Sequence, residues 1–117
     1  MEKVYIGVDF QARDLKGANF INANLINANF RGANLLGANL TGANLTGADL
    51  TGANLLGADL VEANLSDANL SGAYLSDANL INTNFSEAKN VPYIPMSCPE
   101  EGEFIAYKKC RRETHSY

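Results

Sequence analysis

A large apolar residue recurs at every fifth position through most of this 117-residue chain. The series runs from Phe10 to Phe85 without a slip and consists only of leucine and phenylalanine, at 16 positions. An α-helix turns by about 140° net over five residues, so it would spread these side chains around every face. A flat strand would place successive ones on opposite sides. Only a chain that bends once in every unit can bury all of them.

The residue two positions after each large one is suited to such a bend. It is glycine in eight of the 16 units and asparagine in three others. These residues favour the positive φ that a type II turn requires at its second central position. Glu62 and Glu87 occupy the same position and fit that turn poorly, so we expect type I or irregular corners there. We also expect an irregular first coil, because Arg13 stands where other units have a small inward residue.

The remaining positions of the unit are equally regular. A small residue precedes each large one by two positions from Ala18 to Ala78, and Asn or Asp stands between them except at Tyr74. The backbone of a bent chain finds hydrogen-bond partners when its coils stack about 4.8 Å apart. The large residues then meet at the centre with the small ones beside them. The Asn or Asp, the next residue and the corner residue point outward.

Units such as GANLT, GADLT and GANLL resemble the pentapeptide-repeat family, whose pattern is A-[ND]-L-x-x. The resemblance covers about residues 8–87. It implies an all-β fold, a right-handed quadrilateral β-helix with four units per coil and about four coils, stabilised by stacking of neighbours. We expect residues 1–89 to form this β-helix, with the segment MEKVYIG as an N-terminal cap. Residues 90–117 then form a C-terminal capping or tail segment.

The C-terminal run CPEEGEFIAYKK is loosely similar to a segment that follows such repeats in some bacterial and phage proteins, where it opens a longer module. The chain is therefore, as one alternative, a fragment of a larger pentapeptide protein. Its 13 acids against 9 bases argue against direct nucleic-acid binding. No stretch is long and apolar enough to cross a membrane, and the start lacks the features of a signal peptide. With two cysteines, these features predict a bacterial or phage protein of the reducing cytoplasm.

No combination of residues predicts catalysis, a cofactor or a metal. The only histidine, His115, lies near the end of the chain, where we expect a solvated tail. Cys98 and Cys110 are 12 positions apart without a C-x2-C pair, so reduced thiols are favoured over a disulfide, and over a metal site with His115. The basic run KKCRR at 108–112 is interpreted as part of the solvated tail rather than as a contact for nucleic acid or an acidic partner. The chain is not expected to be an enzyme.

Outward-facing apolar residues are the more informative feature. They concentrate on two adjacent sides of the predicted coil, where one aromatic residue also breaks the Asn/Asp pattern. We predict a contact surface there, formed by Leu36, Leu56, Val61, Tyr74 and Ile81. Its occupant would be an unknown protein partner, a second copy in a homodimer, or the chain's own tail. The alternative is a monomer in which these are scattered surface aliphatics, which β-surfaces tolerate.

The sequence thus predicts a non-enzymatic protein-interaction or structural repeat module. A different function is suggested by the acidic stretch between Arg31 and Lys89, which holds six acids and no base. Some family members resemble duplex DNA in shape and charge and bind DNA gyrase. This chain has about half the coils expected of such a mimic, and its acids scatter over all four predicted sides. DNA mimicry is therefore kept as the alternative.

Overall fold

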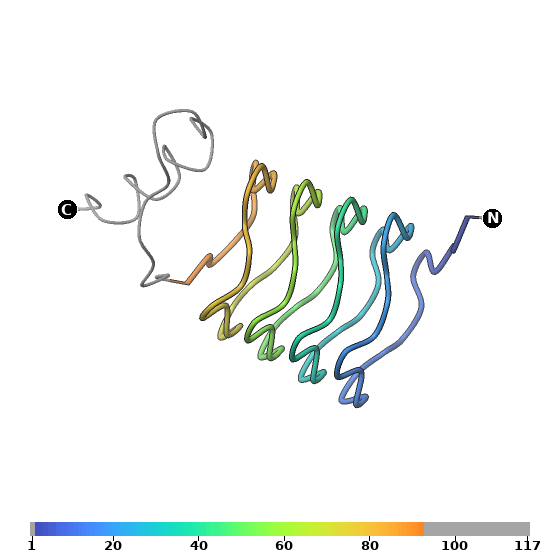
Figure 1. Ribbon diagram of the computed structural model, residues 1–117, viewed down its shortest axis with the longest axis horizontal. Helices are drawn as coiled ribbons and strands as arrows, with labels where there is room; N and C mark the ends of the chain where they lie inside the picture. The colour runs from blue at the N-terminus through green and yellow to red at the C-terminus, as the bar shows by residue number, and fades with distance from the viewer. Residues whose placement is uncertain (1, 93–117) are drawn as a thin grey trace.

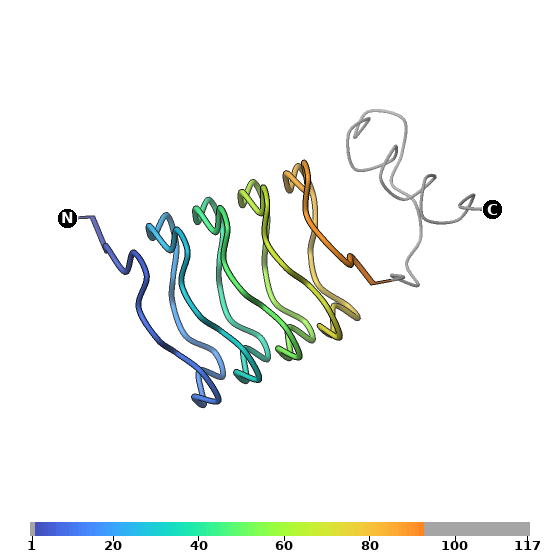
Figure 2. The ribbon, with the colours of Figure 1, turned by 180° about the vertical axis from the view of Figure 1, so that it is seen from behind.

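The computed structural model describes residues 2–92 as a chain wound into stacked coils along one axis (Figures 1 and 2). The stacking is parallel, and each bridging residue pairs with the residue 20 positions further on, from Val4↔Asn24 to Asn69↔Lys89. Twenty residues are four units, so each coil has four sides, as the family resemblance implied. All 14 bridges are isolated residue pairs, and residues 2–92 contain neither a helix nor a longer strand. The two termini of this part lie at opposite ends of the stack.

The corners are uniform along the whole stack. At all 17 corner positions from Gly7 to Glu87 the backbone has a positive φ, between 57° and 69°. The amide of the next residue then closes the turn, as where Ala38 N donates to Leu35 O at 2.9 Å. The positive φ falls on the second central residue only, as in a type II turn.

The two glutamate corners follow the same geometry, so the expectation of type I or irregular corners was wrong. Glu62 has a φ of 60° and Glu87 a φ of 58°. Glu62 N also donates to Ile81 O in the next coil at 3.0 Å, the bond that glycine corners make. The stacked coils dictate the corner conformation, and the local preference of the residue does not override them.

The first coil begins earlier than the leucine and phenylalanine series. Tyr5 N donates to Asn24 O at 2.7 Å and Gly7 N to Ile26 O at 2.9 Å, the same bonds that every later unit makes. The segment MEKVYIG is therefore not a separate cap, because its second half is the first repeat unit. The backbone at Arg13 is regular as well, since Arg13 N donates to Phe10 O at 3.0 Å. The expected irregularity is absent because no earlier coil of the described chain encloses this slot, and the Arg13 side chain is exposed.

The core is a column of leucines flanked by alanines. Every inward-facing leucine of the five-residue series from Leu25 to Leu70 is at most 1% exposed. Towards the N-terminal end the column becomes aromatic, and the rings of Tyr5, Phe10, Phe20 and Phe30 lie 4.9–6.1 Å apart. Thr83 replaces alanine in one slot, where its buried hydroxyl donates to Leu60 O at 2.7 Å. The last bridge is at Lys89, and Val91 packs against the core beyond it.

Candidate functional site

The Asn or Asp before each large residue has a structural role in addition to facing outward. Its side-chain oxygen accepts a hydrogen bond from the backbone amide two residues further on. This Asx-turn bond occurs at all 15 Asn or Asp positions between Asp9 and Asn84, with distances of 2.9–3.3 Å. In each unit of the interior coils, the other backbone amides donate to the neighbouring coil or close the turn, and the Asx-turn bond gives the one remaining amide an acceptor. This role was not predicted from the sequence, although the constant spacing between the Asn or Asp and the turn was the signal for it.

Tyr74 is the one residue in these rows, from Asp9 to Asn84, that cannot supply this bond. Its backbone is regular, because Tyr74 N donates to Ala53 O at 2.9 Å and Leu55 N donates to Tyr74 O at 2.7 Å. It pairs with Asn54 in the preceding coil, as expected. Its side chain is 53% exposed. The chain therefore presents an aromatic ring to solvent at a position where every other unit from Asp9 to Asn84 stabilises its own turn.

The other four residues of the predicted contact surface lie in the columns that the sequence assigned them. Leu36 and Leu56 share one side, because Gly37 N donates to Leu56 O at 2.9 Å. Val61 and Ile81 share the next side through the corresponding bond of the Glu62 corner. All four are only half-buried. The predicted contact surface therefore consists of four aliphatic side chains that project little into solvent and one exposed aromatic side chain, that of Tyr74.

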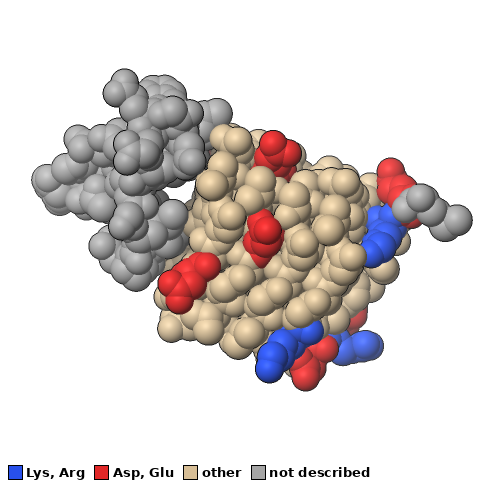
Figure 3. Space-filling model, viewed as in Figure 1, with Lys and Arg blue, Asp and Glu red and all other residues tan. Residues whose placement is uncertain are grey.

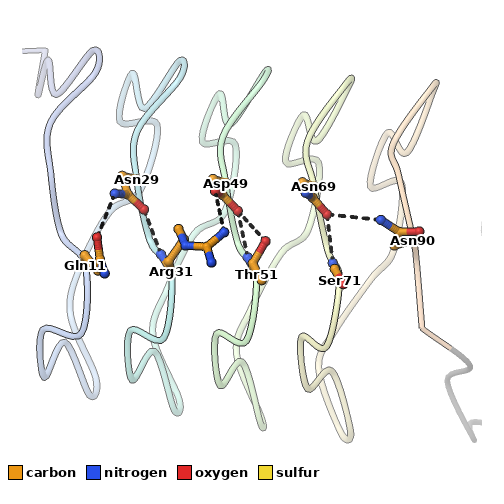
Figure 4. Close-up of polar contacts among 8 residues, drawn as sticks. All are labelled: Gln11, Asn29, Arg31, Asp49, Thr51, Asn69, Ser71 and Asn90. Atoms are coloured by element: carbon orange, nitrogen blue, oxygen red, sulfur yellow. Dashed lines mark hydrogen bonds and ion pairs between the residues drawn. The ribbon is translucent and has the colours of Figure 1, made fainter.

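The side that carries Arg31 is polar instead, and its side chains bond from coil to coil (Figure 4). Asn29 Nδ2 donates to Gln11 Oε1 at 3.3 Å, and Arg31 Nη1 donates to Asp49 Oδ2 at 3.3 Å. Burial raises the pKa of Asp49, but hydrogen bonds from the hydroxyl and amide of Thr51 and the charge of Arg31 outweigh it. The pKa of Asp49 therefore lies below its ordinary value. This side is stabilised by its own contacts and is a poor candidate for a contact surface.

Acidic side chains on the face shown in Figure 3 form separate spots, some among uncharged residues and others beside Lys or Arg. Four of the six acids between Arg31 and Lys89 stand at corners, namely Glu62, Asp67, Asp77 and Glu87. Only Asp67 and Glu87 share one column, 20 residues apart. A duplex presents two continuous rows of phosphates with one charge per about 1.7 Å of axis. The described surface lacks such a density of charge.

The other sequence-based candidates fall outside this part of the chain. His115, Cys98, Cys110 and the basic run 108–112 all lie beyond the described residues. Within residues 2–92, no group of three or more His, Cys, Asp or Glu side chains is arranged to hold a metal ion. The same residues include no helix that could cross a membrane.

Comparison with known proteins agrees with the geometry. The family model of pentapeptide repeats matches residues 6–42, 28–67 and 58–89, with eight copies. The chain belongs to the pentapeptide-repeat family. No curated protein sequence matches it significantly.

Solved structures of pentapeptide-repeat proteins resemble this one. The protein AT2G44920 from the Arabidopsis thaliana thylakoid lumen is 36% identical, with a TM-score of 0.77 over 86% of this chain and 71% of that one. The Nostoc PCC 7120 protein alr5209 is 31% identical, with a TM-score of 0.55 over 85% of this chain and 81% of that one. Trypsin-treated QnrB1, a plasmid-mediated fluoroquinolone resistance protein, is 21% identical with a TM-score of 0.38, over 75% of this chain and 58% of that one. Similarity at that level does not indicate what this pentapeptide-repeat protein binds.

Proposed function

We propose that this chain is a non-enzymatic binding module, a right-handed quadrilateral β-helix that binds a protein partner. The contact surface is formed by Leu36, Leu56, Val61, Tyr74 and Ile81. The single observation that carries the proposal is Tyr74, whose exposed ring stands where 15 other positions have an Asn or Asp that bonds the turn. A residue that gives up a stabilising bond and exposes an aromatic ring is typical of a binding surface, because tyrosine is enriched at interfaces and among their hot spots.

The neighbours of Tyr74 suit this role. Tyr74 lies on the same side of the coil as Leu36 and Leu56. It is paired with Asn54, which is itself paired with Asn34, and each leucine stands two positions after one of these asparagines. The corresponding position on the polar side holds Arg31, Thr51 and Ser71. A half-buried aliphatic surface with a projecting aromatic ring fits an apolar groove or face of a folded protein better than it fits a charged polymer.

The experiment compares partner recovery from a lysate of the source cells. The variant combines Leu36→Thr, Leu56→Thr and Tyr74→Asn. Threonine is compatible with the first two positions, because Thr46 occupies the equivalent place and donates its hydroxyl to Asn44. The matched control is Ile26→Thr, on another side of the coil. We expect a specific partner with the wild type and the control, and none with the triple variant. Equal recovery with all three would overturn the proposal.

The gyrase-binding alternative has no specific observation in its favour, because the acids are separated on the surface. We propose that the protein leaves gyrase supercoiling activity unchanged and acts in the cytoplasm. A supercoiling assay and fractionation of the source cells test these two statements. Inhibition of supercoiling by the purified protein would support DNA mimicry instead.

A further inference from the structure

The N-terminal end of the stack carries an unpaired backbone edge. In the interior, each bridging residue makes two backbone bonds to the preceding coil: Asn44 N donates to Ala23 O at 2.9 Å, and Asn44 O accepts from Leu25 N at 2.7 Å. In the first coil, the amides of Val4, Asp9, Asp14 and Asn19 have no such partner within residues 2–92. Of their carbonyls, only that of Asn19 accepts a bond, from Lys3 Nζ at 3.1 Å. Unpaired edges of this kind are templates for pairing with another chain.

The same end is the most apolar exposed part of the described molecule. Four large apolar side chains are classed as exposed in residues 2–92, and three of them, Val4, Ile6 and Ile21, lie in the first coil at 41–54% exposure. Tyr5, Phe10 and Leu15 face inward beside them but are only half-buried, because no coil precedes theirs within residues 2–92. The rings of Tyr5 and Phe10 pack edge to face against Phe20. The end is thus an aromatic platform with an aliphatic rim.

The shape of the edge restricts what can pair with it. Each side offers a single bridging residue, and a turn with positive φ separates it from the next. A straight, extended peptide could bridge one side only, because the chain changes direction every five residues. An object with the same four-sided profile is needed to satisfy the whole edge. The coil of a second pentapeptide stack has that profile.

Charge favours two N-terminal ends meeting. Residues 2–23 contain three acids and three bases, Glu2, Asp9, Asp14, Lys3, Arg13 and Lys16, so this end is neutral with both signs present. The last 22 described residues, 71–92, contain two acids and one base, Asp77, Glu87 and Lys89. Two N-terminal ends can therefore place opposite charges together, whereas two C-terminal ends would each bring a net negative charge. The chain also continues beyond Pro92 at the C-terminal end.

We propose that the exposed first coil is a self-association surface, on which a second copy docks end to end through a two-fold axis. Facing edges then run antiparallel, and in an antiparallel pair two residues can exchange both backbone bonds. The platform of Tyr5, Phe10 and Leu15 is buried against its own copy. Such an interface is closed, so assembly stops at the dimer. This proposal concerns the end of the stack and does not depend on the side surface proposed above.

The test uses the full chain and measures sedimentation velocity over a wide range of protein concentration. Arg13→Glu changes the charge of the neutral end from zero to minus two, at a side chain that is exposed and outside the core. Lys89→Glu makes the same change in net charge at the other end. We expect the wild type to form dimers, Arg13→Glu to weaken the dimer about tenfold or more, and Lys89→Glu to leave it unchanged. Thermal melts check that both variants fold.

Hydrogen exchange of the wild type provides a readout that needs no variant. The backbone amides of Asp9, Asp14 and Asn19 should exchange more slowly at high protein concentration than at low, while those of the central coils stay the same. The proposal is overturned if the wild type is a monomer at millimolar concentration, or if these amides show no added protection. Growth beyond the dimer would indicate head-to-tail stacking, and weakening by Lys89→Glu alone would place the interface at the other end. Both results would overturn it too.

Discussion

Asn54 and Tyr74 lie opposite each other in adjacent coils as a parallel bridged pair, yet only Asn54 stabilises the turn that follows it. Asn54 Oδ1 accepts a hydrogen bond from Leu56 N at 3.0 Å. The phenol of Tyr74 cannot reach back in this way to the amide of Ser76. An exposed ring replaces a bond that every other unit from Asp9 to Asn84 makes. Under the proposed function, stability and binding therefore make opposite demands on Tyr74.

Replacement of Tyr74 should therefore separate the effect on stability from the effect on binding. We expect Tyr74→Asn to raise the free energy of unfolding by about 1 kcal/mol, the net worth of one intramolecular hydrogen bond. Urea unfolding measures the change. Tyr74→Phe is the control, because it keeps the ring and supplies no acceptor, so its stability should match the wild type. A loss of stability in Tyr74→Asn would show that the ring itself supports the fold.

Two glycine corners differ in their surroundings although their backbones are alike. Gly37 and Gly42 have φ values of 65° and 68°, and a methyl group at Gly37 would meet nothing within 4 Å. A methyl group at Gly42 would collide with the side-chain oxygen of Asn22, at the corner one coil earlier. We expect Gly37→Ala to cost about 0.5–1 kcal/mol, because the strain of the left-handed backbone, about 1–2 kcal/mol, is partly offset by the backbone entropy that glycine loses on folding, about 0.5–1 kcal/mol. Gly42→Ala should cost about 1 kcal/mol more, because the Asn22 side chain must leave its rotamer.

A double-mutant cycle checks that assignment. Asn22 itself has a φ of 57°, so glycine is compatible with its corner. In the background of Asn22→Gly, the cost of Gly42→Ala in urea unfolding should fall to that of Gly37→Ala. If the two alanine variants are equally destabilised without that change, the contact with Asn22 is not what distinguishes these corners.

The sequence predicted most of the fold because one rule repeats. The five-residue period determined which side chains are buried, and the 20-residue pairing followed from the family resemblance. The corners at Glu62 and Glu87 were predicted wrongly, since local turn preference is weaker than the constraint from the coils on either side. The start of the stack was placed too late because Tyr5 is neither leucine nor phenylalanine, although Tyr5 and Gly7 keep the spacing. Side-chain exposure at Val4, Ile6 and Ile21 depends on where stacking stops, which the period alone does not reveal.

The glutamate corners lead to a prediction about strain. Glu62 adopts a φ of 60°, in the region that costs a residue with a Cβ about 1–2 kcal/mol. Glycine avoids this cost but loses more backbone entropy on folding, by about 0.5–1 kcal/mol. We therefore expect Glu62→Gly to stabilise the protein by about 0.5–1 kcal/mol in urea unfolding. Glu62→Gln removes the charge and keeps the backbone strain, so any gain shared by both variants would be due to the charge instead.

The lowered pKa of Asp49 makes the stability of the polar side depend on pH. In the folded chain Thr51 and Arg31 favour the charged carboxylate, and these contacts are lost on unfolding. The unfolded chain therefore binds more protons than the folded one between the two pKa values. The stabilisation is present above the unfolded pKa of about 3.9 and is lost as the pH falls through the folded value.

Asp49→Asn tests this dependence, because asparagine retains an oxygen that can accept from the Thr51 amide but does not titrate. We expect the wild type to be more stable than Asp49→Asn at pH 7, and the difference to shrink as the pH falls below about 4. Urea midpoints at several pH values measure it. Because the Arg31 side chain is half exposed, high salt should screen its ion pair with Asp49 and reduce the stability difference between wild type and Asp49→Asn. An Arg31→Gln background should reduce that difference as well. A difference between wild type and Asp49→Asn that stays constant from pH 7 to pH 2 would mean that the charge of Asp49 does not stabilise the folded state.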